Sequence, residues 1–370
     1  MSHAARLMYK KVAVILVIAL VLSALVGPFG LGVASASEDQ VSRVEGKNRY
    51  ETAANIAKAA YPDGNDTVIV ARGENVIADA LAASVLAGAK NAPILLTKEK
   101  SLPPETQQAI EDLGAEQVYI LGNEYAISKA VEDALKELVG ESNVKRVSGN
   151  DRYETAVAVA KEAVSSAEKA YLANGEKTAD ALVAGPAAFV NQVPVLLVKQ
   201  DSIPDVVWEA LDDLGVEEIV LVGSVDVISK AVEDALKAEG YDVRRVGGED
   251  RFETSVDFAK SEFPEAASYG IVKGQHDKDA ESGVDAVAAV VLGQPLLYAT
   301  KNGVLNDTVQ NFIAERAAAN PAVTFTIFGD ENAVVADVEN DVKEIIEENA
   351  EFRIVSVNAI TPQQIELIFK

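Results

Sequence analysis

Nearly the same six residues occur three times in this chain, as NRYETA at 48–53, DRYETA at 151–156 and DRFETS at 250–255. The copies stand about one hundred residues apart. Self-similarity at a fixed period is the sequence signature of a chain built from repeated structural units. The fold must therefore be one that roughly a hundred residues can form, and that three consecutive copies can form side by side.

Other words recur at matching places in the copies. The nine letters SKAVEDALK occur identically at 128–136 and 229–237, which indicates tandem duplication. A short strand-like word also precedes each hexamer, as RVEG at 43–46, RVSG at 146–149 and RVGG at 245–248.

Each repeat reads as alternating strands and helices. After the first hexamer, Ala53, Ile56, Ala57 and Ala60 recur with the spacing of one helix face. The next segment, TVIVA at 67–71, is a continuous apolar strand. Such strands, alternating with helices, indicate a parallel sheet covered on both faces. We therefore predict an α/β fold in which each repeat is a small doubly wound module.

The repeats also predict the domain organisation. We place the three modules at 41–143, 144–242 and 243–350. The remaining segment, 351–370, alternates like β-strands around a turn at Pro362. We interpret this segment as the last strand of repeat three, followed by the start of a truncated β domain.

The first 36 residues are predicted to be a secretory signal peptide. Arg6, Lys10 and Lys11 form a basic head, an apolar run follows, and Ala34 and Ala36 frame a small-residue cleavage site. An uncleaved membrane anchor is the alternative, because the apolar run approaches the length of a membrane span. The glycines and the proline at the end of the run favour cleavage, and with it a secreted protein.

Composition excludes several classes of protein. The chain has no cysteine, which excludes disulfides, thiol enzymes and cysteine–zinc sites. Its formal net charge of −25 argues against nucleic acid as a partner, because phosphate binding needs a basic surface. Solubility is the simplest interpretation of this acidity. Binding of divalent cations and adaptation to salt are the alternatives.

Few residues could support catalysis. The only histidines are His3, in the signal segment, and His276, in an irregular stretch of repeat three. No HExxH, Gly-x-Ser-x-Gly or nucleotide-binding glycine pattern occurs. We therefore predict that the chain is not an enzyme, with no catalytic residue, metal site or cofactor. Hydrolysis by a pair of carboxylates is the alternative that 58 acidic residues leave open.

Each hexamer places an arginine in the first turn of a predicted helix, at Arg49, Arg152 and Arg251. Capping-box spacing explains the Asn or Asp before the arginine and the glutamate after it. It does not explain the arginine, because a cation in the first turn opposes the helix dipole. The arginine either pairs with an acid of a neighbouring module or holds an anionic ligand.

A second recurring charge is an aspartate after the first strand following each hexamer, at Asp79, Asp180 and Asp285. It stands at the carboxyl edge of the predicted sheet, where open α/β sheets bind ligands. A helix-start acid favoured by the dipole is the simpler interpretation. In repeat three, the insertion QHDKDAESG lengthens the loop before this aspartate.

Each repeat also carries a short apolar word that begins with proline. Burial of a strand is sufficient to explain it. The residues are Pro93, Ile94, Leu95 and Leu96, then Pro194, Val195, Leu196 and Leu197, and finally Pro295, Leu296 and Leu297.

Together these words resemble the cell-wall-binding repeat type 2 family of Gram-positive surface proteins, over about 43–347. The resemblance implies three Rossmann- or Toprim-like modules packed as a pseudo-threefold ring. It also implies noncovalent attachment to an anionic secondary cell-wall polysaccharide, with an anchoring role for the proline-led strands. The third copy departs from the pattern at Ser255, Asp285 and Tyr298. The tail at 356–370 resembles the opening of the Ig-like domains of surface-layer proteins.

We therefore expect a secreted, noncatalytic anchoring module that holds a wall polymer through three repeated sites. Several modest sites in one rigid body bind a repeating polymer by avidity, which explains why the hexamer occurs three times. Other surface-layer proteins are further candidate partners, whereas nucleic acid and, after signal cleavage, membrane are not. The alternatives are a cell-wall hydrolase, an accessory similar to an amidase enhancer, and a surface-layer lattice subunit.

Overall fold

The computed structural model describes residues 40–74, 78–274, 283–300, 302–349, 354–361 and 364–369. The predicted signal segment and His276 lie outside these residues. Within them, no helix combines the length and the apolar character needed to cross a membrane.

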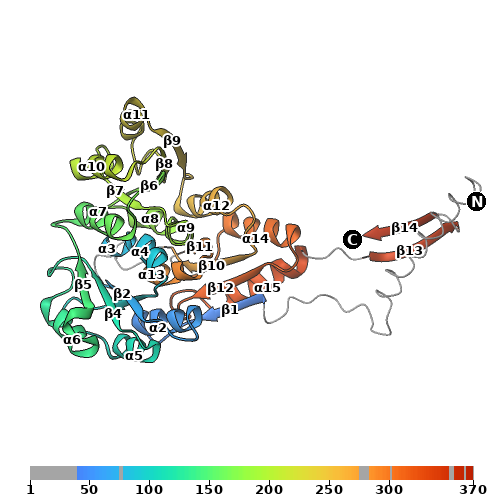
Figure 1. Ribbon diagram of the computed structural model, residues 1–370. Helices are drawn as coiled ribbons and strands as arrows, with labels where there is room; N and C mark the ends of the chain where they lie inside the picture. The colour runs from blue at the N-terminus through green and yellow to red at the C-terminus, as the bar shows by residue number, and fades with distance from the viewer. Residues whose placement is uncertain are drawn as a thin grey trace, which may run out of the picture.

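The three repeats have the same order of helices and strands, which Figure 1 follows along the chain from blue to red. Repeat one contains β1 (Val41–Val44), α2 (Arg49–Ala60), β2 (Thr67–Arg72), α3 (Ala78–Leu81), α4 (Ala83–Lys90), β3 (Ile94–Thr97), α5 (Pro104–Leu113), β4 (Gln117–Leu121) and α6 (Lys129–Val139). After the 3-10 turn η2 (Glu141–Asn143), repeat two contains β5 (Val144–Val147), α7 (Arg152–Ala163), β6 (Lys169–Asn174), α8 (Thr178–Val183), α9 (Gly185–Asn191), β7 (Val195–Val198), α10 (Asp205–Leu214), β8 (Glu218–Val222) and α11 (Lys230–Ala238). Repeat three contains β9 (Asp242–Val246), α12 (Arg251–Glu262), β10 (Ser268–Lys273), α13 (Val284–Ala289), η3 (Val290–Leu292), β11 (Leu296–Ala299), α14 (Asp307–Ala319), β12 (Thr324–Phe328) and α15 (Asp337–Asn349), and a hairpin of β13 (Ile354–Thr361) and β14 (Gln364–Phe369) follows.

The recurring hexamer begins a helix in all three repeats, because its first residue caps that helix. The side chains of Asn48, Asp151 and Asp250 accept hydrogen bonds from the backbone N–H groups two and three residues later. The following glutamate departs from the expected capping box. Glu154, for example, accepts from the N–H of Asn150, one residue before the cap, at 2.8 Å. Each cap contributes about 1 kcal/mol.

Three four-stranded sheets form the framework, and the strands within each sheet are all parallel. Their orders are β3-β2-β4-β5, β7-β6-β8-β9 and β11-β10-β12-β1. Helices flank each sheet, so the predicted α/β fold of three tandem modules is confirmed.

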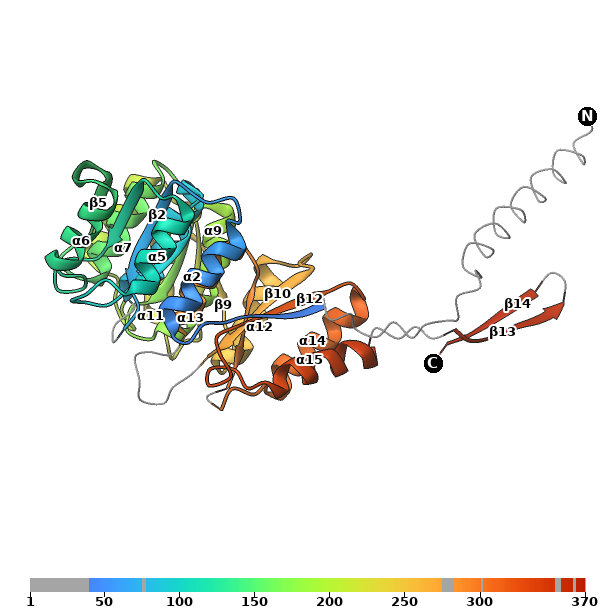
Figure 2. The same cartoon turned by 90° about the horizontal axis from the view of Figure 1, so that it is seen from below.

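No repeat completes a sheet from its own strands. The first strand of repeat two, β5, lies beside β4 of the first sheet, and β9 of repeat three lies beside β8 of the second. The first strand of the chain, β1, completes the third sheet, where Val41 pairs with Phe325 and Val44 with Phe328. Figures 1 and 2 show this blue strand beside the orange β12. Main-chain pairing therefore links the modules into a closed ring.

This closure corrects one prediction. The sequence predicts the last strand of repeat three within 351–370, but β1 occupies that place and β13 pairs with β14 in an antiparallel hairpin. Alternating residues indicate a strand without identifying its partner. Arg43 and Val44 are the same two residues that end the exchanged strands of the other repeats, at 146–147 and 245–246, and β1 fits the same sheet edge.

The modules share one hydrophobic core at the centre of the ring. Helices α4 and α9 and the turn η3, one from each repeat, meet there. A Cβ on Gly88 would lie 2.1 Å from the carbonyl oxygen of Phe189, and a Cβ on Gly185 would lie 2.5 Å from Val290. Backbones approach this closely only where side chains are small or absent. The contact therefore explains why α4 and α9 are rich in alanine and glycine.

A largely buried arginine ties each exchanged strand to the module that receives it. These arginines, Arg43, Arg146 and Arg245, come from the words that precede the hexamers. Each donates a hydrogen bond to the carbonyl oxygen of a strand-ending glycine, at Gly329 (2.8 Å), Gly122 (2.7 Å) and Gly223 (2.9 Å), respectively. Each also pairs with a glutamate on the last helix of the receiving module, at Glu339, Glu132 and Glu233.

Replacing Arg43 with alanine tests the closure. The substitution leaves Glu339 without this partner and removes hydrogen bonds to three backbone carbonyls, at a site where the Arg43 side chain is 9% exposed. We expect the free energy of unfolding to fall by about 2–4 kcal/mol. Because the modules share a core, we also expect one cooperative transition. Urea denaturation followed by circular dichroism measures both.

Lys129→Ala is the control, because Lys129 is exposed and pairs with Asp133 on its own helix. Its loss should change stability by less than about 0.5 kcal/mol. A separate early transition of the third module in Arg43→Ala would contradict the ring as a single unit.

Candidate functional site

The first helix of each repeat lies at a junction between two modules. Helix α7 packs against α3 and α4 of the first module, α12 against α8 of the second, and α2 against α13 of the third. Each of these helices begins at the carboxyl edge of the sheets. There the hexamer arginine donates a hydrogen bond to the carbonyl oxygen of a glycine, which directly follows the next strand of the same repeat. The pairs are Arg49 with Gly73 at 2.7 Å, Arg251 with Gly274 at 2.7 Å, and Arg152 with Gly175.

The structure also brings each predicted aspartate near the arginine of the next repeat. The pairs are Asp79 with Arg152, Asp180 with Arg251 and Asp285 with Arg49. The third pair joins the last repeat to the first, so all three junctions follow one plan. At the first two junctions the side chain of the hexamer threonine, Thr155 or Thr254, also lowers the pKa of the aspartate. Each arginine thus lies close enough to an acid of the neighbouring module for its charge to lower the pKa of that acid.

A left-handed glycine makes room for each aspartate. Gly122, Gly223 and Gly329 follow β4, β8 and β12 with φ angles of 96°, 108° and 103°. A Cβ on Gly223 would lie 2.9 Å from a carboxylate oxygen of Asp180. These positions therefore favour glycine both for the backbone conformation and for the close carboxylate.

Burial opposes ionisation of these carboxyl groups. Removal from water raises the pKa of Asp180 to about 6, although Thr254 and Arg251 act in the opposite direction. Burial likewise raises the pKa of Asp285 to about 6, against the charge of Arg49. The pKa of Asp79 is also raised by burial. The second and third junctions therefore hold carboxyl groups that titrate at mildly acid pH.

Clefts open beside two of the junctions. The cleft beside Asp180 has a volume of about 550 Å³ and lies between the loop at Lys177 and the helix start at Arg251. A second cleft of about 540 Å³ lies at the first junction, between Tyr125 and Glu154. Both volumes fall within the range of small-molecule sites, roughly 300–1,000 Å³. Across the described residues, no group of histidine, cysteine, aspartate and glutamate side chains is arranged to hold a metal ion.

Two exposed lysines at this edge are not singled out by the sequence analysis. Lys98 follows β3 and Lys199 follows β7, and each ammonium lies over the ring of a hexamer tyrosine. The distances to the ring centres are 5.7 Å for Tyr50 and 5.8 Å for Tyr153. In the sequence, both lysines directly follow the proline-led strand, after PILLT and PVLLV, and this shared position could have identified them.

The proline-led strands lie inside the modules. They form β3, β7 and β11, and the apolar side chains at 94–96, 195–197 and 296–298 are at most 1% exposed. The prolines before them, Pro93, Pro194 and Pro295, are buried as well. A polymer could reach these side chains only if the sheet opened. Ligand contacts are therefore expected on the exposed rim around these strands.

The tyrosine that distinguishes the third copy makes a contact between modules. Tyr298 stands where the other copies have leucine, at Leu96 and Leu197. Its side chain is fully buried, and its hydroxyl donates to the carbonyl oxygen of Ala179 in the second module. This departure from the repeated pattern therefore joins modules two and three.

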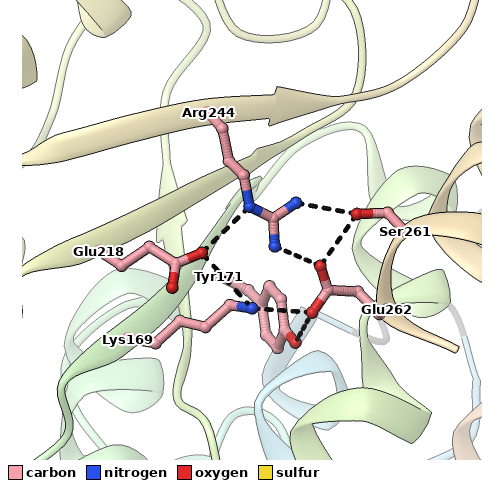
Figure 3. Close-up of polar contacts among 6 residues, drawn as sticks. All are labelled: Lys169, Tyr171, Glu218, Arg244, Ser261 and Glu262. Atoms are coloured by element: carbon pink, nitrogen blue, oxygen red, sulfur yellow. Dashed lines mark hydrogen bonds and ion pairs between the residues drawn. The ribbon is translucent and has the colours of Figure 1, made fainter.

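The opposite edge of the second sheet carries an ionic cluster that fixes the far end of α12. Glu262 accepts hydrogen bonds from Lys169, Tyr171 and Arg244 (Figure 3). Burial alone would raise the pKa of Glu262, but these hydrogen bonds lower it to about 2. Helix α12 is thus held at its start by Arg251 and at its end by Glu262.

The repeated frame has counterparts in known proteins. A sequence model described as cell wall binding domain 2 (CWB2) matches residues 43–132, 146–233 and 245–339. The chain belongs to the cell wall binding domain 2 family. The resemblance noted in the sequence is therefore confirmed, and membership indicates a protein that binds the cell wall.

Similar proteins are longer than this CWB2 chain. It is 31% identical over 307 residues to the N-acetylmuramoyl-L-alanine amidase LytC of Bacillus subtilis, covering 83% of this chain and 59% of the amidase. It is 28% identical over 301 residues to the amidase enhancer of the same organism, covering 80% of this chain and 39% of the enhancer. Among solved structures, Cwp6 from Clostridium difficile has a TM-score of 0.74 at 27% identity, and Cwp8 from the same organism has 0.73 at 28%. Both structural matches cover 84% of this chain, and they cover 48% of Cwp6 and 52% of Cwp8. The chain therefore spans about half the length of the proteins it matches.

The raised pKa values of Asp180 and Asp285 predict how stability of this CWB2 ring depends on pH. In the unfolded chain both carboxyl groups titrate near pH ~4. Between that pH and about 6, the folded state therefore binds more protons than the unfolded state. Stability should fall as pH rises through this window, by up to about 3 kcal/mol per group. Urea denaturation at several pH values measures this slope.

Asp180→Asn should flatten the slope, because an amide does not titrate. Asp234→Asn should leave it nearly unchanged, since Asp234 is exposed on α11. Below pH ~4 the lowered pKa of Glu262 acts in the opposite direction, so stability should fall as that carboxylate is protonated. An unchanged slope in Asp180→Asn would show that this carboxyl is not penalised by burial.

Proposed function

We propose that this chain is a secreted, noncatalytic anchoring module that binds an anionic wall polysaccharide at its three junctions. The observation that carries the proposal is one aspartate–arginine frame repeated around a closed ring of a cell wall binding family. A site for a single reaction has no reason to be built three times. A repeating polymer, in contrast, presents the same chemical group to every junction.

Local charge allows an acidic chain to hold an anionic polymer. The formal net charge of −25 opposes the approach of such a polymer. Salt limits this repulsion to about 10 Å at moderate ionic strength, so charges at the contact outweigh distant ones. Lys98, Lys177 and Lys199 are exposed at the carboxyl edges of the first two modules. They supply positive charge where the polymer would bind.

The ring makes avidity effective. Because the modules share sheets and a core, the junctions are held at fixed distances from one another. A polymer bound at one junction then meets the next at high effective concentration. The same sharing means that an isolated repeat would lack one strand of its sheet. Avidity is therefore measured in the intact ring, by altering one junction at a time.

Retention on wall sacculi tests the proposal. The purified chain is bound to sacculi of Bacillus subtilis before and after their secondary polymers are removed with hydrofluoric acid. We expect removal to abolish retention, and Lys98→Gln combined with Lys199→Gln to lower it about three- to tenfold. Retention should also fall with rising salt, because exposed charge contacts are screened.

Lys58→Gln combined with Lys161→Gln is the matched control. These lysines lie at the far ends of α2 and α7 and pair with Asp112 and Asp213. Their substitution removes the same amount of charge as the substitution of Lys98 and Lys199. We expect this variant to be retained normally. Equal losses in the two double variants, or full retention on stripped sacculi, would contradict binding at the junctions.

A catalytic role is the second candidate, because the matched Bacillus subtilis proteins are named as an amidase and an amidase enhancer. Dye-labelled walls separate the two roles. Release of labelled fragments above a buffer control would overturn the noncatalytic proposal, whereas retention without release would support it.

A further inference from the structure

We propose that the second module carries a separate site for a saccharide ring bearing a protonated amine, on its outer surface between α10 and the start of β9. The site is a cleft of about 490 Å³ lined by Trp208, Asp212, Glu239 and Tyr241. It shares no lining residue with the clefts at the junctions. The inference therefore does not depend on the proposed function of those junctions.

Two aromatic rings form one part of this cleft. The ring centres of Trp208 and Tyr241 are 6.3 Å apart, and their planes are tilted by 32°. Both side chains pack partly against the core of the second module, which holds the rings in place while leaving them accessible. The face of an aromatic ring attracts cations and packs against apolar surfaces, including the C–H face of a sugar.

Two carboxylates without partners form the other part. Asp212 and Glu239 are exposed, and within the described part of the chain neither side chain forms an ion pair or a hydrogen bond. Their charges add to the effect of burial in raising the pKa of the neighbouring Tyr241 hydroxyl. Free carboxylates of this kind hold an ammonium group through charge-assisted hydrogen bonds.

The other repeats show that the fold does not require this arrangement. Gln107 stands in repeat one where Trp208 stands in repeat two, three residues into the equivalent helix. There it donates a hydrogen bond to Glu111, the counterpart of Asp212, at 3.0 Å. Repeat three has Gln310 at this place. In repeat one, the glutamine thus donates a hydrogen bond to the acid four residues later. In repeat two, Trp208 stands in its place and gives Asp212 no such bond.

An amino sugar matches both parts of the cleft. Its ring offers a C–H face to Trp208, and its ammonium group offers charge and donors to Asp212 and Glu239. A sugar carrying phosphate or carboxylate would be repelled by the two acids. A neutral sugar would gain the ring contact without the ion pair. The charge of the ligand therefore decides its affinity here.

Trp208 is itself the reporter for the test, because it is the only tryptophan of the chain. The intact chain is titrated with glucosamine oligomers at mildly acid pH, where their amines are protonated, and in parallel with N-acetylated oligomers of the same length. We expect a saturable change in Trp208 emission with the amine form. Binding of the acetylated form should be about tenfold weaker.

Tyr241→Ser keeps the reporter and installs the residue that repeat one has at this place, Ser142. It should weaken binding about three- to tenfold. Trp208→Gln, followed by calorimetry, should remove measurable binding, and both variants should keep the melting temperature within a few degrees. Asp234→Asn removes one charge of the same module outside the cleft and should bind normally.

The lysine variants at the junctions should bind glucosamine oligomers as the unmodified chain does, so failure of the junction proposal would not affect this result. No saturable emission change, equal affinity for the acetylated oligomer, or unchanged affinity in folded Tyr241→Ser would overturn the inference.

Discussion

Main-chain pairing between different repeats is the interaction on which the rest of the structure depends. Because β5 and β9 complete the preceding sheets and β1 completes the last one, no module has its full sheet without a neighbour. The helix after each exchanged strand begins at the junction as a result. The hexamer arginine and threonine therefore come to lie beside the aspartate of the preceding module, as Arg251 and Thr254 lie beside Asp180. Strand exchange alone therefore places these residues together at each junction.

The parts of this arrangement that local sequence encodes could be predicted, and the linkage between modules could not. Apolar periodicity and capping residues such as Asp151 act within a few neighbours, so they identify helices and the fold class. The partner of a strand is a nonlocal property. Nothing near Arg43 shows that it meets Glu339, 296 residues away, or that β1 takes the place expected for a strand near the end of the chain. Lys98 likewise becomes a candidate only when it is placed over the ring of Tyr50.

The two ends of α12 show how partners decide the state of a buried acid. At the far end, three donors surround Glu262 and lower its pKa to about 2 despite burial. Near the start of the helix, Asp180 is also buried, but its neighbours compensate less, and its pKa is raised to about 6. The first arrangement locks the helix in place. The second leaves an incompletely compensated carboxyl beside a cleft, the condition under which functional groups are found.

Duplication has preserved the frame of this molecule and altered its surface. The frame residues are restricted by geometry: Gly223 must adopt a positive φ against a carboxylate, and Gly185 must admit a neighbouring helix. Positions at the rim carry no such restriction, and Trp208, packed partly against the core of its module, stands where the other copies have glutamine. Similar frames with unlike rims hold different exposed side chains at fixed separations around one ring. Side chains at the rim, such as Trp208 in the second module, therefore distinguish one module of this ring from the next while the shared core is kept.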